Sequence, residues 1–238
     1  MSVTRSVKTA FGLPRSAQSL IVLVLAAYLA VLGAGSVNSH LSGNQGLTLL
    51  VFTVAVVSSI EISLRLAWPR ARKDRLSRDF LGVWAWPVML LLPPAAAALF
   101  AAIGVLYIQA RGFKRDTVKI AYNIAAIGLA RAAAGWVHAV IAGPHDSWPT
   151  ADQLFGTHSG VLAVLAAVVV FWALNNGLVA AVVAATAGWS AARGVSSRES
   201  LMVDAVDLGM GVVVAVVWVT NPWLLPLAAV PVLYMQHQ

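Results

Sequence analysis

The chain has 238 residues, of which 60% are apolar, only 11% are charged and none is cysteine, and its formal net charge is +7. A soluble domain carries about 25% charged residues, so this composition leaves too few polar side chains to cover a surface in water. The lack of cysteine excludes disulfides, thiolate nucleophiles and cysteine metal sites. The positive charge gathers between apolar segments, which indicates membrane topology rather than binding of nucleic acid.

Long apolar segments recur along the chain and predict membrane-spanning helices, because about 20 apolar residues cross a hydrocarbon layer about 30 Å thick. The first one follows a basic start and resembles a signal peptide, but no clear cleavage site precedes a soluble domain, so we expect a retained helix. The segments are 18–36, 46–67, 80–108, 118–141, 159–188, 201–219 and 222–235. We therefore expect an all-α, polytopic membrane bundle, with a tail over residues 1–17, one transmembrane domain over 18–235 and a short end at 236–238.

Lysine and arginine are very unevenly distributed among the connections, which determines the expected topology. Positive residues remain on the cytoplasmic side of a membrane. The connections rich in lysine and arginine are the N-terminus, 68–79, 109–119 and 189–200, and those without either are 37–45, 142–158 and 220–221. The first group is expected inside and the second outside, with both termini in the cytoplasm.

Segment 80–108 lies between two basic connections, so both of its ends are expected on the cytoplasmic side. It is too short to cross twice at full length. Pro93–Pro94, near its middle, removes two amide donors and disfavours helix at the preceding residue. This predicts about six transmembrane helices plus a re-entrant or short hairpin with the arms Phe80–Leu92 and Pro94–Ala110. The alternative is one proline-kinked helix that violates the charge rule.

One predicted span carries a polar stripe at membrane depth, where ionisable residues are costly and are functional candidates by default. Arg131 lies near the middle of segment 118–141. His138 follows two helical turns later on nearly the same face, and Asn123 lies toward that side.

A buried arginine needs a counter-charge. Glu61, in the inner half of the second span, is the expected partner of Arg131 and can also pair with Arg65 four residues later. Such a network is either a ligand-binding site or a structural strut between helices.

Other polar residues carry weaker signals. Asn175–Asn176 lie in the middle of segment 159–188, where side-chain amides bond across helices or to a ligand. Asp204 and Asp207 start the sixth segment, where acids favour the positive end of the helix dipole. Tryptophans near segment ends are typical of interfacial belts, namely Trp68, Trp84, Trp86, Trp148, Trp189 and Trp223.

The sequence contains no phosphate-binding loop, serine nucleophile elbow or zinc-protease motif. The histidines in the outer connections do not have metal-ligand spacing. We therefore expect no catalytic residue, no metal and no cofactor.

The C-terminal half contains VVVFWALNNGLVAAVVA (168–184), ESLMVDAVDLGMGVVVAVV (199–217) and NPWLLPLAAVPVLYMQHQ (221–238). With the proline break of segment 80–108 and with Asn123, this resembles the membrane domain of actinobacterial signalling proteins, over about residues 46–238. In that family the domain precedes a cytoplasmic cyclic-di-GMP output domain of the GGDEF, EAL or HD-GYP type. This sequence stops after the last span, so the resemblance implies a stand-alone relative or a fragment, with no enzymatic activity of its own.

Three functions follow as alternatives. The first is a sensory or regulatory domain of the cell membrane, which binds a small or lipid-like ligand or a partner protein and signals to the cytoplasm. The second is a substrate-binding membrane subunit of a small-molecule importer, which a broken hairpin and midplane polar groups also suit. The third is an accessory subunit of a larger membrane complex. All three imply contact with the lipid bilayer, and none implies nucleic acid.

Overall fold

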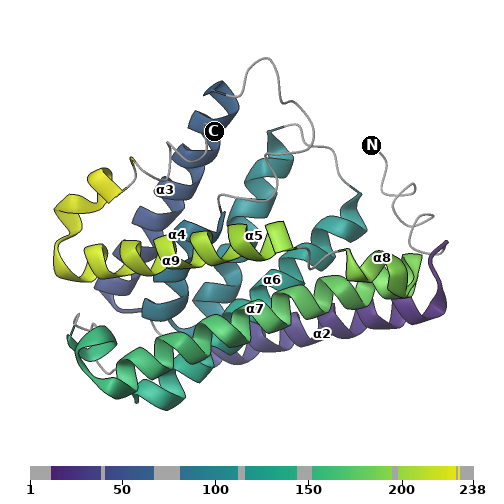
Figure 1. Cartoon of the computed structure of the whole chain (residues 1–238), viewed down its shortest axis with the longest axis horizontal. Coiled ribbons are helices and arrows are strands. Elements are labelled where there is room, and N and C mark those ends of the chain that lie inside the picture. The colour runs from purple at the N-terminus through teal and green to yellow at the C-terminus, as the bar shows by residue number, and fades with distance from the viewer. Residues whose placement is uncertain are drawn as a thin grey trace.

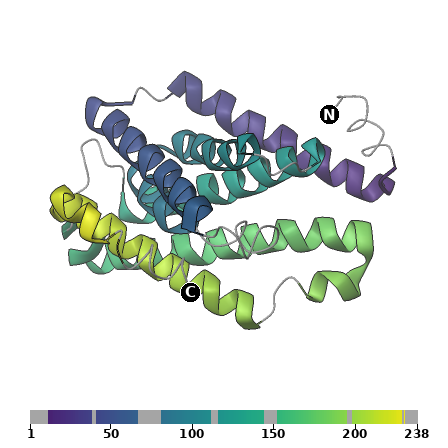
Figure 2. The same ribbon diagram turned by 90° about the horizontal axis from the view of Figure 1, so that it is seen from above.

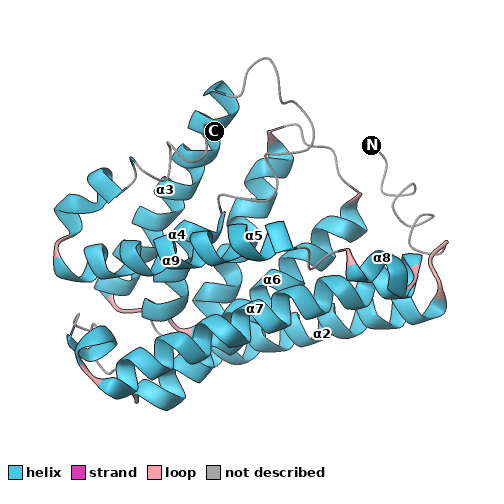
Figure 3. Cartoon of the chain, in the orientation of Figure 1, coloured by secondary structure: helices cyan, strands magenta, loops and turns pink. Residues whose placement is uncertain are grey.

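The computed structural model describes residues 12–38, 41–66, 81–111, 116–143, 152–194, 198–228 and 230. Every regular element in these ranges is helical, as the composition predicts (Figures 1 and 3). The helices are α2 (Arg15–Asn38), α3 (Gly43–Leu66), α4 (Leu81–Leu91), α5 (Pro94–Ala110), α6 (Thr117–Ala142), α7 (His158–Ala187), α8 (Trp189–Arg193) and α9 (Arg198–Thr220). A π-helical turn, η1 (Asp152–Gly156), precedes α7, and a 3₁₀ turn, η2 (Pro222–Leu224), follows α9.

Several sequence-based expectations concern segments outside the described residues. These segments are residues 1–11, the 68–79 connection, residues 144–151 of the outer connection and the chain end at 231–238.

Four of the described helices are long and apolar enough to cross a membrane. Their candidate spans are Arg15–Gly35, Gly43–Ile62, Thr117–Ala142 and His158–Ala187. Helix α9 contributes a shorter apolar stretch, Ala205–Thr220. The expectation of a multi-pass membrane protein is therefore supported by helix length and composition.

The proline pair breaks segment 80–108 into two helices, as predicted. Helix α4 ends at Leu91 and α5 begins at Pro94, with Pro93 in an extended conformation at its N-cap. The indole of Trp84, early in α4, donates to the Ser59 hydroxyl near the end of α3. Arg111, at the end of α5, pairs with Glu61 in that same region of α3. Both open ends of the α4–α5 pair therefore lie beside the C-terminal end of α3, and the two helices form a hairpin.

Helix α4 lies at the centre of the bundle. Its described side chains from Val83 to Leu91 are all buried, and it contacts α3, α5, α6 and α9. A helix that is apolar on every side is stable only when protein or lipid surrounds it completely. Figure 2, turned from the first view, shows the ribbons of α5 and α6 between α2 and α7.

Aromatic side chains fill the core around α4. Phe52 packs edge-on against Trp218, with ring centroids 5.3 Å apart, and Trp86 packs in the same way against Phe171 at 5.5 Å. Trp218 also donates its indole N–H to Thr48 on α3. These contacts join α3, α4, α7 and α9 through side chains rather than backbone hydrogen bonds.

The interfacial assignment of Trp84 and Trp86 is wrong. Both indoles are buried, at 3% and 2% exposure, because the helix that carries them is enclosed by protein rather than by headgroups. Trp189 and Trp223 are exposed at helix ends, at 75% and 89%. Trp68 and Trp148 lie outside the described residues.

Glycines allow close approach where the hairpin meets its neighbours. A Cβ on Gly135 of α6 would lie 2.9 Å from the Met89 carbonyl oxygen. That carbonyl would normally accept a hydrogen bond from residue 93, which is proline and has no donor. A Cβ on Gly128 would clash with the Tyr28 ring and lie 3.1 Å from the Ala98 carbonyl oxygen. Helix α6 therefore approaches the backbone of α4 and of α5 closely at two positions that carry no side chain.

The described basic residues other than Arg131 lie at or close to helix ends. The Tyr122 hydroxyl near the start of α6 donates to the Leu178 carbonyl, so the start of α6 lies beside the C-terminal half of α7. The ion pair of Arg111 with Glu61 joins the ends of α5 and α3. The basic residues at or near helix ends are Arg15, Arg65, Arg111, Lys119, Arg193 and Arg198. Basic residues at the ends of apolar helices are typical of membrane proteins.

Two glycines of α9 provide a matched test of the packing around α4. A Cβ on Gly211 would lie 2.5 Å from Cδ1 of Trp86, whereas nothing lies within 4 Å of a Cβ on Gly209. Overpacking costs about 1–3 kcal/mol, which exceeds the gain of about 0.5–1 kcal/mol from replacing a helical glycine with alanine. We expect Gly211→Ala to lower the thermal unfolding midpoint in detergent and Gly209→Ala to leave it unchanged or raise it. Equal effects of the two variants would contradict the predicted contact between α4 and α9.

Candidate functional site

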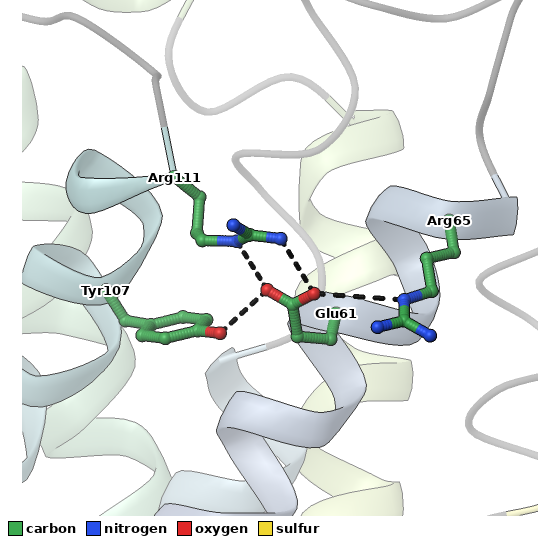
Figure 4. Close-up of polar contacts among 4 residues, drawn as sticks. All are labelled: Glu61, Arg65, Tyr107 and Arg111. Carbon is green, nitrogen blue, oxygen red and sulfur yellow. Dashed lines mark hydrogen bonds and ion pairs between the residues drawn. The ribbon is translucent and has the colours of Figure 1, made fainter.

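Glu61 is the centre of a polar cluster at the ends of α3 and α5, called here the Glu61 cluster (Figure 4). The Tyr107 hydroxyl donates to Oε1 of Glu61 at 2.7 Å, and Nη2 of Arg111 donates to Oε2 at 2.9 Å. Nε of Arg111 also pairs with Oε1. Arg65 approaches from the other side, with its Nε 4.0 Å from Oε2. One carboxylate thus joins two helices that are far apart in the sequence.

The spacing of the residues explains this arrangement. Glu61 and Arg65 are four residues apart on α3, and Tyr107 and Arg111 are four residues apart at the end of α5, so each pair shares one helical face. Arg111 is the C-cap residue of α5, where a cation interacts favourably with the helix dipole. Its hydrogen bond to Glu61 raises its pKa further above the ordinary arginine value, so the guanidinium is protonated at neutral pH.

The three charged side chains of the Glu61 cluster differ greatly in exposure. The side chain of Glu61 is 21% exposed, that of Arg111 is 48% exposed and that of Arg65 is 83% exposed. Exposed ion pairs are screened and gain little. The contacts from Tyr107 and Arg111 therefore hold Glu61, and Arg65 contributes mainly positive charge nearby.

Arg131 forms a second centre, buried in the bundle and 4% exposed. Its guanidinium carbon lies 5.7 Å from the centroid of the Phe100 ring on α5, within the range of a cation–π contact. The negative charge of Asp207 on α9 acts on this guanidinium. Within the described part of the chain, Nε of Arg131 has no hydrogen-bond partner. A charged donor without an acceptor is costly in an interior of low dielectric constant.

The expected pairing of Glu61 with Arg131 is wrong. Arg111 and Tyr107 occupy both oxygens of Glu61, and Asp207 supplies the opposite charge that acts on Arg131. Glu61 lies one helical turn before the end of α3, whereas Arg131 lies in the middle of α6. The pairing of Glu61 with Arg65 is confirmed, at the limit of ion-pair distance.

The assignment of Asp207 to a helix start is also wrong. Helix α9 begins at Arg198, so Asp207 lies beyond its first two turns and far from the positive end of the dipole. Its carboxylate occupies the space beside Gly82, where a Cβ would overlap Oδ2. A glycine at the start of α4 thus makes room for the carboxylate whose charge acts on Arg131.

The remaining polar residues of the predicted network lie elsewhere along α6 and α7. His138 is buried at 2% exposure, two turns beyond Arg131. The Tyr122 hydroxyl donates to the Leu178 carbonyl at 2.6 Å, which brings Asn123 and the Asn175–Asn176 pair to similar depths on facing helices.

The two asparagines of α7 use their amides differently. The Asn176 amide donates to the Trp172 carbonyl one turn earlier in its own helix, at 3.0 Å. Oδ1 of Asn175 is buried and has no hydrogen-bond partner among the described residues. The structure therefore places the six predicted residues in at least three separate regions.

Sequence reasoning missed the residues that complete both centres. Tyr107 and Arg111 complete the Glu61 cluster, and Tyr28, Phe100 and Asp207 surround Arg131. The sequence contained one signal for Tyr107 and Arg111: like Glu61 and Arg65, they are four residues apart near the end of an apolar segment, so they share one helical face. In the ranges described, no group of three or more histidine, aspartate or glutamate side chains gathers as metal ligands.

Comparison with known proteins identifies no relative: no family model matches the chain, and neither a curated protein nor a solved structure matches it.

The geometry of the Glu61 cluster predicts an order of effects on stability. Glu61→Gln removes the group on which all the contacts converge and should lower the thermal unfolding midpoint most. Arg111→Gln should lower it less, and the exposed Arg65→Gln least, close to the control Arg193→Gln at the end of α8. Differential scanning fluorimetry of the purified protein measures this order. A loss with Arg65→Gln as large as that with Glu61→Gln would contradict the central role of α5.

Proposed function

We propose that the chain is a regulatory domain of the cell membrane that binds a small or lipid-like ligand beside Arg131 and transmits a helix movement to the cytoplasm. We further propose about six membrane crossings, with α4–α5 as a re-entrant hairpin and with both termini in the cytoplasm. The uneven distribution of lysine and arginine among the connections, with basic residues at helix ends, supports this orientation. The resemblance to membrane sensor domains is consistent with it.

The single observation that carries the proposal is the buried guanidinium of Arg131. Its Nε lacks a hydrogen-bond acceptor within the described residues, and the nearby Asp207 acts on it through charge. Ionisable groups at membrane depth are rare because they are costly, and they mark functional sites. A ligand with a carboxylate, phosphate or carbonyl oxygen would supply the acceptor that Arg131 needs.

The surroundings of Arg131 suit an amphipathic ligand. The Phe100 ring and the Tyr28 side chain provide aromatic surface, and the Tyr28 hydroxyl donates to the Ala98 carbonyl at 3.3 Å. Binding sites for small molecules combine mostly apolar walls with a few polar groups that orient the ligand.

Helix α5 connects the two centres physically. Phe100 contacts Arg131, and Tyr107, two turns later on the same helix, donates to Glu61 at the predicted cytoplasmic end. A ligand can shift such a helix only if it binds two arrangements with different affinity. A displacement of α5 at Phe100 would therefore strain or release the Glu61 cluster, from which a partner protein would read the change.

The proposal predicts that Arg131 is required for ligand retention but not for folding. Replacing a buried charged group with an apolar one of similar size is often neutral or stabilising. We expect Arg131→Met to fold with an unchanged or higher unfolding midpoint. It should lose a small molecule that copurifies with the wild type and with the control Arg193→Met, as measured by mass spectrometry of native extracts.

A structural strut would give the opposite result. In that case, Arg131→Met would unfold at a clearly lower temperature, and no molecule would copurify with the wild-type protein. Either finding would contradict the ligand proposal.

The topology is testable because the chain has no native cysteine. Single cysteines at Arg65, Lys119 and Arg193 should react with a membrane-impermeant thiol reagent only from the cytoplasmic side. Single cysteines at Ser42 and Thr157 should react only from the outside. Labelling of positions 65 and 119 from opposite sides would show that α4–α5 crosses the membrane once.

A further inference from the structure

The Glu61 cluster carries more positive charge than its single carboxylate neutralises. Two guanidinium groups face one carboxylate, and Tyr107 and Arg111 already occupy both of its oxygens. Arg65 reaches Oε2 only at 4.0 Å, on the side of Glu61 away from Tyr107 (Figure 4), and its side chain is 83% exposed. Because a guanidinium has five donors, most of those of Arg65 are directed to the surroundings.

The position of this excess charge matches the edge of a bilayer. Arg65 lies three residues beyond the candidate span Gly43–Ile62, and Arg111 follows directly on the apolar helix α5. Tyr107 lies one turn inside Arg111, and tyrosine is suited to a level where one end of the side chain is apolar and the other is wet. In a bilayer crossed by α3, the two guanidinium groups would lie at the level of the lipid phosphates.

The sequence near both arginines is rich in further basic residues. Both arginines lead directly into basic stretches, with Arg70, Arg72, Lys73, Arg75 and Arg78 after α3 and Lys114, Arg115 and Lys119 after α5. Each basic residue near a membrane surface adds about 1 kcal/mol of attraction to anionic lipid.

We propose that Arg65 and Arg111 bind the phosphate group of an anionic phospholipid. The planar guanidinium forms paired hydrogen bonds to phosphate oxygens, which a single ammonium group cannot reproduce. A zwitterionic headgroup fits less well, because the only carboxylate in the cluster is already bonded to α5. This inference needs the bundle to lie in a membrane but does not depend on a ligand at Arg131.

The test uses the full chain purified in an uncharged detergent. Its thermal unfolding midpoint is titrated with short-chain phosphatidylglycerol, with the matched phosphatidylcholine and with inorganic phosphate. We expect a saturable rise with phosphatidylglycerol alone. Arg65→Gln should weaken the apparent affinity for it about tenfold, the change expected from losing hydrogen bonds to a charged group. Arg65→Lys should restore only part of the affinity.

Arg193→Gln is the matched control, because it removes the same charge from an exposed arginine at the end of α8. It should leave the titration unchanged. An equal loss of affinity for phosphatidylglycerol with Arg193→Gln would indicate that the lipid responds only to the net charge of the protein, and it would overturn the proposed site. An equal response to inorganic phosphate would identify a small-anion site instead, and an equal response to phosphatidylcholine would show that the headgroup charge is irrelevant.

Discussion

The structure depends on one constraint, namely that backbone polar groups surrounded by lipid must find their partners within the protein. Helix α4 contains Pro87, and the hairpin turns at Pro93 and Pro94, so several carbonyl groups lose their usual helical donors. The protein accommodates this break by burying it. Helices α3, α5, α6 and α9 contact α4, and Gly135 lets α6 approach the Met89 carbonyl. The glycines of α6 and the aromatic core around α4 are consequences of enclosing this break.

Two charge centres remain separate within the bundle because their depths differ. Glu61 is close enough to the end of α3 to meet Arg111, whose position at the end of α5 is already favourable for a cation. Arg131 lies deeper, among aromatic rings, and interacts with Asp207 from α9. Helix α5 contacts both centres, through Phe100 at Arg131 and through Tyr107 at Glu61, although the two centres share no ion pair among the described residues.

Much of the architecture could be predicted from the sequence. The apolar runs predicted the helices, and the two prolines predicted the break between α4 and α5. Both features are determined by residues that are neighbours in the sequence. The polar partners were harder to predict. The pairing of Glu61 with Arg131 rested on the need of each charge for an opposite one, but several acids and bases satisfy that need equally well. Only the packing of α3 against α5, and of α9 against α4, decides which pairs meet.

The prediction that Trp84 and Trp86 lie at the membrane interface was wrong for a related reason. The rule for interfacial belts assumes that a segment end faces lipid, and it cannot recognise a segment enclosed by other helices. Trp84 and Trp86 lie near the end of an apolar segment, as interfacial tryptophans do, but their side chains are buried in the protein core. Asp207 was misassigned because α9 begins three residues before the apolar segment does, which moves the acid from the helix start to its interior.

The enclosure of α4 has a consequence for biosynthesis. Helix α9, which packs against Trp86 through Gly211, is translated more than a hundred residues after α4. In a nascent chain that has been synthesised only as far as α7, the face of α4 that later packs against α9 therefore has no protein neighbour. The bundle is complete only after α9 has been synthesised and inserted and has packed against α4. Helix α4 is therefore made early but reaches its final environment late.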